Sequence, residues 1–351
     1  MLVNPRTEKP GVPGVPGGDT AAMNEQPAAP LPAPPTPPST QPPAAAQWLT
    51  LQVATANLLN LALPGYAFYP GQEPYDEQEY ERKLQWLGAM LARLNADVVG
   101  FQEVWHEAAL KAAVARSGLR MAAVLAPGAE QGAVGTPRLA LATRLEVESV
   151  RSLVDFAPAD QVQVPDLGLH ARFERPVLHA RLRTRQGTRL HVLVVHLKSK
   201  RPKFLQDAAG NVLEDRDDPA ITARATLRSL VMRAAEAAAL RRAVVAITSR
   251  HGDYASSGGE PLVLLGDMND GPHAVTTQMI AATQAVAYDR GARDVALYHA
   301  WDVATEPALK RDMAYSHVHH PRSSTKPILR LKPVICDCIA SNSVPLPNSL
   351  L

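Results

Sequence analysis

The sequence has few cysteines, no long apolar run and little net charge, and each shortage excludes a class of protein. Its 351 residues include two cysteines, Cys336 and Cys338, which lie too close in the chain to provide a disulfide framework. No run of about eighteen apolar residues occurs, so we expect no membrane-spanning helix. A formal net charge of +2 does not by itself indicate nucleic-acid binding, so any basic surface must come from local clustering.

The N-terminal segment differs in composition from the rest of the chain. Residues 1–46 are rich in proline, alanine and glycine, and we expect a disordered leader that acts as a tether. The residue order that defines a signal peptide is absent there, and we predict a cytoplasmic protein without a protein partner. Residues 47–320 are long enough to bury a sizeable core, and we predict one domain over this range.

Beyond the leader, the apolar pattern alternates between strand and helix. Apolar stretches predict strands at 49–56, 97–101, 139–142, 178–182, 190–195 and 261–265, with a hairpin turn at Gln186-Gly187. Helical spacing predicts helices over 76–95, 107–117 and 222–248, and another after Pro272. Because hairpins and helices are interleaved, we expect an α/β (α+β) fold of two packed mixed sheets with helices outside, a four-layer α/β/β/α sandwich.

Polar side chains lie where four of these predicted strands end. They are Asn57, Glu103, His196, and the pair Asp267 and Asn269. Strand ends open into loops where polar groups can meet a substrate, and two residues that are two apart face the same way in extended backbone. Taken singly, each is more readily a turn former, a helix-terminal charge or a structural histidine. Taken together, they suit a phosphate and a hard cation, Mg²⁺ or alternatively Mn²⁺, better than zinc.

Four segments resemble successive motifs of the endonuclease/exonuclease/phosphatase superfamily, in the family's order. They are Ala54-Thr55-Ala56-Asn57, Val99-Gly100-Phe101-Gln102-Glu103-Val104, Val195-His196-Leu197-Lys198-Ser199 and Leu265-Gly266-Asp267-Met268-Asn269-Asp270. The resemblance covers most of residues 48–320. It implies a metal-dependent hydrolase of phosphodiester bonds, most simply an endonuclease that acts on nucleic acid.

The resemblance also implies a role for each site residue. Glu103 is similar to a metal-binding glutamate, and Asn57 to an asparagine that helps to hold both metal and phosphate. His196 is similar to a histidine that hydrogen-bonds the scissile phosphate. Asp267 and Asn269 are similar to the pair that orients the attacking water and the phosphate, so His196, Asp267 and Asn269 form the expected catalytic set.

Two groups of basic residues allow two interpretations each. A basic run follows His196 and is either a phosphate-contacting rim or a solvated loop. Its members are Lys198, Lys200, Arg201 and Lys203. Lys198 is the expected substrate-binding residue among them. Arg224 and Arg228 lie on one helical face and either point toward the site or form surface ion pairs.

The C-terminal part departs from the family's pattern. The segment 315–320 resembles the one that precedes the family's late motifs, but no Asp-His dipeptide occurs anywhere in the chain. Residues 335–339 are one candidate for a degenerate Asp-His-Ile strand, with Asp337 in the aspartate's place. We therefore expect an atypical tail over 321–351, a fold that is incomplete at this end with exposed sheet edges, and weak or no activity. The loss of a general base costs ~10²- to 10⁴-fold in rate.

Three functions stay open on the sequence alone. The first is a magnesium-dependent nuclease, and the second is a phosphoinositide phosphatase or sphingomyelinase-like phospholipase of the same superfamily. The third is a catalytically inactive remnant that binds phosphorylated ligands. A zinc site made from His317, His319, His320 and the two cysteines is disfavoured, because their spacing matches no familiar template.

Overall fold

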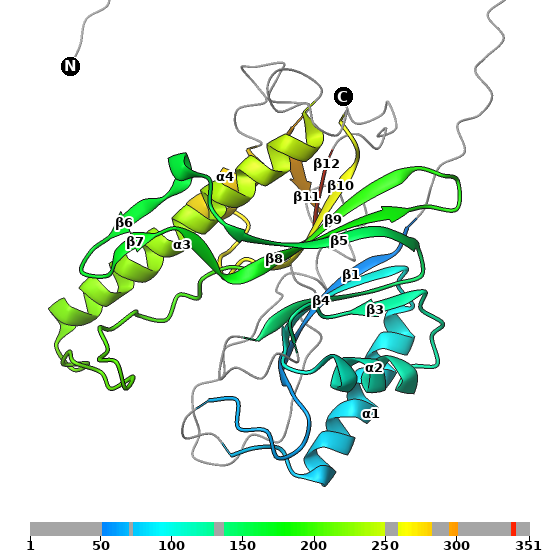
Figure 1. Cartoon of the computed structure of the whole chain (residues 1–351), viewed down its shortest axis with the longest axis horizontal. Coiled ribbons are helices and arrows are strands. Elements are labelled where there is room, and N and C mark those ends of the chain that lie inside the picture. The colour runs from blue at the N-terminus through cyan, green and yellow to red at the C-terminus, as the bar shows by residue number, and fades with distance from the viewer. Residues whose placement is uncertain are drawn as a thin grey trace, which may run out of the picture. The chain divides into compact units, whose positions relative to one another are not determined.

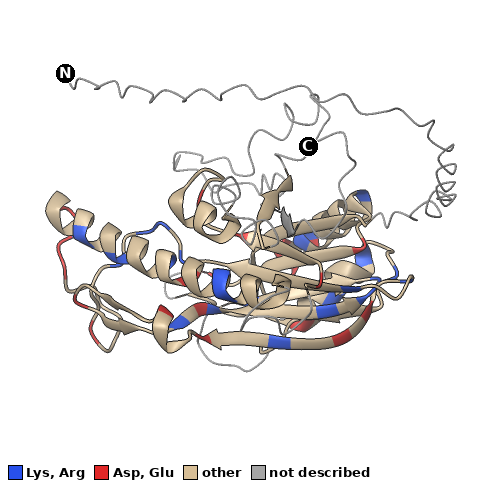
Figure 2. Ribbon diagram, turned by 90° about the horizontal axis from the view of Figure 1, so that it is seen from above, with Lys and Arg blue, Asp and Glu red and all other residues tan. Residues whose placement is uncertain are grey.

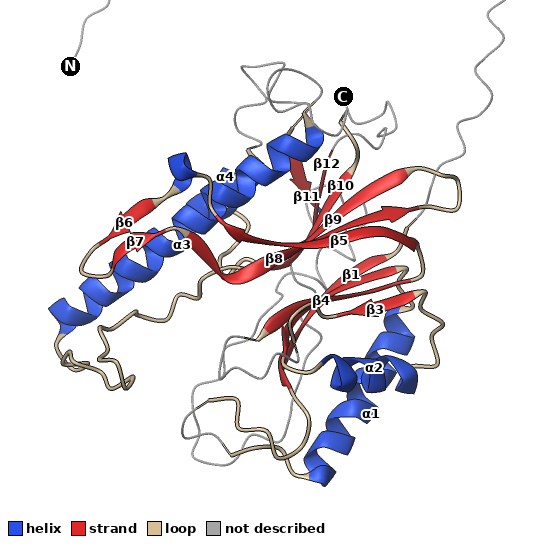
Figure 3. Cartoon of the chain, viewed as in Figure 1, coloured by secondary structure: helices blue, strands red, loops and turns tan. Residues whose placement is uncertain are grey.

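Two large β-sheets, a small hairpin and four α-helices make up the part of the chain that the structure, a computed structural model, describes (Figures 1 and 3). The described residues are 51–69, 73–129, 137–249, 259–282 and 295–300, together with the backbone of 338–341. The predicted leader, the side chains of the disfavoured zinc site and Asp337 lie outside these residues. Within them, no helix is long and apolar enough to cross a membrane.

The first sheet is built from the N-terminal half of the domain. Its order is β1-β2-β4-β3, with β1 and β2 parallel and the other pairs antiparallel. The strands are β1 (Val53–Leu61), β2 (Val98–Val104), β3 (Ala123–Leu125) and β4 (Arg138–Thr143). Helices α1 (Glu77–Leu94) and α2 (Glu107–Arg116) cover its outer face (Figure 1).

The second sheet has the order β11-β12-β10-β9-β8-β5, with β9 and β10 parallel and the other pairs antiparallel. Its strands are β5 (Glu146–Asp155), β8 (Arg172–Arg183), β9 (Arg189–His196), β10 (Leu262–Asp267), β11 (Leu297–His299) and β12 (Cys338–Ser341). Helices α3 (Pro219–Thr248) and α4 (Val275–Ala281) pack on its outer face. The short strands β6 (Val162–Val164) and β7 (Gly168–His170) form a separate hairpin after a 3-10 turn, η1 (Pro158–Asp160).

Three groups of buried apolar side chains separate four layers. One lies between α1, α2 and the first sheet, and another lies between the second sheet and α3 and α4. The middle group joins the two sheets and includes Leu141, Leu182 and Val192. The sheets approach closely at Gly100, where an added Cβ would lie 3.1 Å from Val194 and 3.2 Å from Leu265. The predicted four-layer sandwich of two packed mixed sheets is confirmed.

Both long helices begin where side chains satisfy free backbone N–H groups. Asp76 and Glu79 form a capping box at the start of α1, with the Asp76 carboxylate accepting from Glu79 N at 2.7 Å. The Asp218 carboxylate accepts from Ala220 N at 2.7 Å, and Pro219 occupies the first turn of α3, where no N–H is needed. These caps explain why the periodic patterns begin as helices at these residues.

The structure corrects three predictions about the strands. β1 begins at Val53 rather than 49 and continues past Asn57, and β2 continues past Glu103. Strand β5 was not predicted, because none of its residues is buried and so it has no buried apolar run. We expected the atypical tail to leave sheet edges exposed, but among the described residues the backbone of β12, from the tail, pairs with β10 and β11.

Candidate active site

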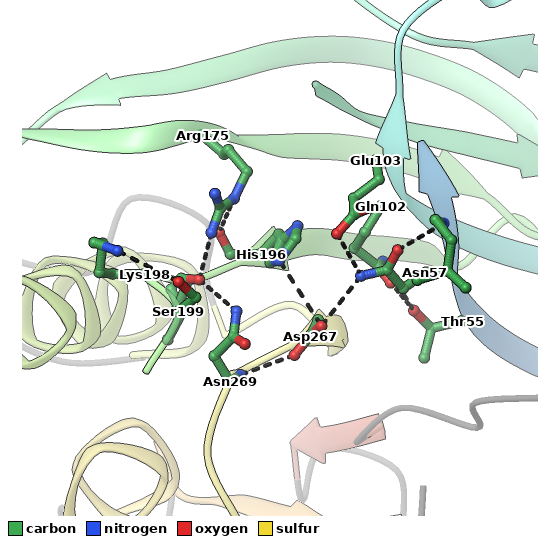
Figure 4. Close-up of polar contacts among 12 residues, drawn as sticks. Thr55, Asn57, Gln102, Glu103, Arg175, His196, Lys198, Ser199, Asp267 and Asn269 are labelled. Carbon is green, nitrogen blue, oxygen red and sulfur yellow. Dashed lines mark hydrogen bonds and ion pairs between the residues drawn. The ribbon is translucent and has the colours of Figure 1, made fainter. Parts of the chain in front are cut away.

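The predicted site residues from the two sheets meet at one point. Asn57 on β1 donates from Nδ2 to Glu103 Oε1 at 3.0 Å and to Asp267 Oδ2 at 3.3 Å. Glu103 belongs to the first sheet and Asp267 to the second, so a single amide joins carboxylates from both (Figure 4). The meeting point lies toward the carboxyl ends of β1, β2, β9 and β10, and all three side chains are partly exposed.

Asn57 and Glu103 lie at irregularities within strands rather than at strand ends. The β1–β2 register shifts after Asn57, and Leu59, Asn60 and Glu103 have φ angles of 48°, 60° and 61°. Non-glycine residues rarely adopt such angles, and β-bulges of this kind commonly redirect side chains beside active sites. Here the bulge points Asn60 N toward Glu103 Oε2 at 3.0 Å and Leu59 N toward Asn57 Oδ1 at 3.0 Å.

Asp267 and Asn269 are close together, but not because the backbone is extended. Asn269 has a φ of 52°, and its N–H donates to Asp267 Oδ1 at 2.9 Å. Its side-chain Nδ2 donates to Leu197 O at 2.8 Å. Gly266 precedes them with a φ of 148°, and a Cβ there would lie 2.1 Å from Val195 O. Only glycine therefore allows β10 to pass this close to β9 just before Asp267.

His196 ends β9 directly opposite Asp267 in the parallel register. Its Nε2 lies 3.8 Å from Asp267 Oδ2, which is too long for a hydrogen bond. Burial, together with the positive charges of Arg175 and Lys198, lowers the pKa of His196 well below its ordinary value of 6.5. The imidazole is therefore neutral at neutral pH and offers one N–H donor.

Arg175 on β8 is a second donor group at the site, and sequence reasoning missed it. Its Nε donates to His196 O at 2.9 Å and its Nη2 to Leu197 O at 2.6 Å (Figure 4). Among the described residues, no carboxylate forms an ion pair with it. A guanidinium held by carbonyls rather than by a carboxylate keeps its positive charge available for an anion. The predicted Gln186-Gly187 turn is a signal that could have placed Arg175 near the site. In a hairpin, residues equally far from the turn lie opposite each other, and Arg175 and Leu197 are equally far from Gln186.

The basic run after His196 is neither a free rim nor a simple solvated loop. Lys198 is buried, and its Nζ donates to Ser199 Oγ at 3.4 Å and lies 3.9 Å from a Glu174 carboxylate oxygen. Lys200 Nζ pairs with Asp270 at 2.7 Å. Helix α3 holds this segment, since Ser229 Oγ donates to Arg201 O at 2.5 Å.

Arg224 and Arg228 do not point to the site. Both bind the Asp166 carboxylate at 2.6 Å, and Arg228, which is fully buried, also binds Glu214 at 2.7 Å. They connect α3 to the turn between β6 and β7 and to the loop before α3. Both arginines therefore form ion pairs, as one interpretation predicted, but Arg228 is buried rather than at the surface.

The model of the Endonuclease/Exonuclease/phosphatase family matches residues 54–313. The chain belongs to this family. Members are generally hydrolases that act on phosphodiester bonds. The described part of the match contains Asn57, Glu103, His196, Asp267 and Asn269, the five residues on which the sequence resemblance depended.

The solved structures that match the chain are distant in sequence, and each has a TM-score below 0.5. The human Nocturnin catalytic domain with bound sulfate is 15% identical, with a TM-score of 0.45 and 82% of each chain covered. A beta toxin from Staphylococcus aureus is 12% identical, with a TM-score of 0.45, and 85% of this chain and 87% of that one covered. Sphingomyelinase C from Streptomyces griseocarneus is 14% identical, with a TM-score of 0.42, and 85% and 86% covered. No curated protein matches the chain.

The donor set decides which metal this family site could hold. Among the described residues, no three His, Cys, Asp or Glu side chains gather closely enough to bind a metal by themselves. Two carboxylates, Glu103 and Asp267, share one amide donor. Magnesium is usually bound by one or two carboxylates plus substrate phosphates and water, so the set suits Mg²⁺ and does not suit zinc. Asn57 turns its nitrogen, not its oxygen, toward the carboxylates, and in this arrangement it serves as a donor.

Proposed function

We propose that the chain is a divalent-cation-dependent hydrolase of phosphodiester bonds, with nucleic acid as its substrate. The observation that carries the proposal is the Asn57 amide, which joins Glu103 and Asp267 across the two sheets beside His196 and Arg175. Anionic groups for a cation and donors for a phosphate thus lie side by side, as hydrolysis of a charged ester requires.

Each residue has a part in the proposed reaction. Glu103 and the nearby Asp267 would hold Mg²⁺ or Mn²⁺, which when bound would neutralise charge on the phosphoryl oxygens. Arg175 and the neutral His196 donate hydrogen bonds to those oxygens. Asp267 and Asn269 orient the water whose oxygen bonds to phosphorus as the bond to the leaving oxygen breaks. Lys198 lies beside Arg175 and adds positive charge.

Cleavage of bis-p-nitrophenyl phosphate and of plasmid DNA, with Mg²⁺, with Mn²⁺ and with EDTA, tests this function. We expect metal-dependent turnover, reduced ~10²- to 10³-fold by Glu103→Gln and by His196→Ala, as for the loss of one stabilising group. Glu81→Gln is the matched control, because Glu81 is an exposed glutamate on α1 that pairs with Arg116. Turnover that survives both site substitutions would refute the site.

The same assay separates the alternatives. Hydrolysis of phosphoinositides or sphingomyelin in preference to DNA would replace nucleic acid as the substrate class. Phosphate binding without turnover on any substrate would identify an inactive remnant, the outcome that the missing Asp-His motif predicts. Localisation in the cytoplasm stays a prediction that fractionation of cells would check.

A further inference from the structure

Glu236 is the single acidic residue of α3, and it is buried beside the candidate site. The 30-residue helix carries five arginines and no other carboxylate, and Figure 2 shows the basic residues of the chain in blue. Glu236 is 1% exposed, and among the described residues no basic side chain forms an ion pair with it. A buried carboxylate is costly unless hydrogen bonds compensate for the lost water, so the donors that it binds identify what it holds.

Both donors are backbone N–H groups from neighbouring strands. Oε1 of Glu236 accepts from Glu174 N at 2.9 Å, and Oε2 accepts from Lys198 N at 2.6 Å. The backbone pairing of β8 with β9 ends at Leu178 and Val194. If this register is continued, Glu174 lies opposite Lys198. The Glu236 carboxylate accepts hydrogen bonds from the backbone N–H groups of both residues, and so it connects the two strands where their own pairing has ended.

These two amides flank the donor groups of the site. Glu174 immediately precedes Arg175, and Lys198 lies two residues after His196. Arg175 in turn binds His196 O and depends on the same spacing between the strands. We propose that Glu236 is a positioning residue that fixes Arg175 relative to His196; this rests on the proposed function of that pair in binding phosphate.

Both oxygens of Glu236 act as acceptors in this geometry, and burial raises the pKa of its carboxyl group to about 7. A carboxylate accepts at both oxygens, whereas a carboxamide accepts at one position and presents N–H groups at the other. In Glu236→Gln, one strand amide would therefore face a donor instead of an acceptor. The size of the side chain is unchanged, so the substitution tests the hydrogen bonds rather than the packing.

Glu214→Gln is a matched control. The Glu214 carboxylate also accepts from a backbone N–H, that of Leu205 at 2.7 Å, and it is largely buried against Arg228. It makes no hydrogen bond with the site residues. Loss of general stability should therefore appear in both variants, and loss of positioning only in Glu236→Gln.

The experiment measures both variants and the wild-type chain in three ways. These are kcat and KM on bis-p-nitrophenyl phosphate with Mg²⁺, the Kd for inorganic phosphate, and amide hydrogen exchange in segments 172–178 and 194–200. For Glu236→Gln we expect kcat to fall at least tenfold with a smaller change in KM, phosphate affinity to weaken, and exchange to rise in both segments. For Glu214→Gln we expect all three to stay within about twofold of the wild type.

The outcomes distinguish the failure of this proposal from that of the function. The positioning role of Glu236 would be refuted if Glu236→Gln showed faster amide exchange but unchanged kcat and phosphate affinity. It would also be refuted if Glu214→Gln lost as much kcat as Glu236→Gln. If the wild type turns over no substrate, the proposed function fails. In that case the phosphate affinity and the exchange decide the positioning role by themselves, and unchanged values in Glu236→Gln reject it.

Discussion

Lys83 gives the first prediction, because it is a buried basic residue that forms no ion pair among the described residues. Its Nζ donates to Leu59 O and to Tyr75 Oη, each at 2.7 Å, and among the described residues no carboxylate pairs with it. Leu59 belongs to the bulge that directs Asn60 N toward Glu103. The side chain is 1% exposed, and this burial lowers the pKa of Lys83 from 10.5 to about 7.

The lowered pKa makes stability depend on pH with a definite sign. Between pH 7 and the ordinary lysine value, the unfolded chain binds a proton that the folded chain has released. The free energy of unfolding therefore rises with pH in this window and levels off above it. With a pKa of about 7 for Lys83, the gain from pH 7 to pH 9 is about 2 kcal/mol. Tyr75, whose pKa is raised to about 12, stays protonated throughout.

Urea unfolding of the wild type and of Lys83→Met at pH 7 and pH 9 measures this effect. The variant should lack the gain of about 2 kcal/mol, because methionine carries no proton to release. Lys111→Met, which removes an exposed lysine paired with Glu107, should keep it. Equal pH dependence in the wild type and Lys83→Met would refute the reasoning.

Three further changes test the fold. Asp76→Ala removes the cap of α1 and should lower the free energy of unfolding by about 1 kcal/mol in urea; no loss would contradict the capping role. Gly100→Ala places a Cβ 3.1 Å from Val194 and should cost about 1–3 kcal/mol, and a thermal midpoint equal to that of the wild type would show that the sheets can separate. Burial lowers the pKa of His179 to about 3 in the folded chain. In the unfolded chain, the same imidazole becomes protonated near its ordinary pKa of 6.5. His179 by itself should lower the free energy of unfolding by about 2 kcal/mol from pH 7 to pH 5, and His179→Gln should reduce the total loss by this amount; a loss as large as that of the wild type would refute the assignment.

The sequence determined the layers of the fold and indicated five candidate site residues. Helix α1 was predicted because burial on one face leaves a regular apolar pattern. Strand β9 was predicted because all its residues but the first are buried and most of them are apolar. The polar residues Asn57, Glu103, His196, Asp267 and Asn269 could be found because each follows an apolar run. Strand β5 left no such pattern, because none of its residues is buried.

Only the tertiary structure decided how these residues meet and which others support them. The left-handed φ angles at Glu103 and Asn269 are not encoded in a hydrophobic pattern, so the extended geometry assumed for Asp267 and Asn269 was wrong. Arg175 and Glu236 are separated from His196 by 21 and 40 residues in the chain, and their hydrogen bonds to the end of β9 depend on strand register and on where α3 packs. A linear pattern reports whether a residue is buried, whereas the pairing of distant residues depends on how whole elements pack.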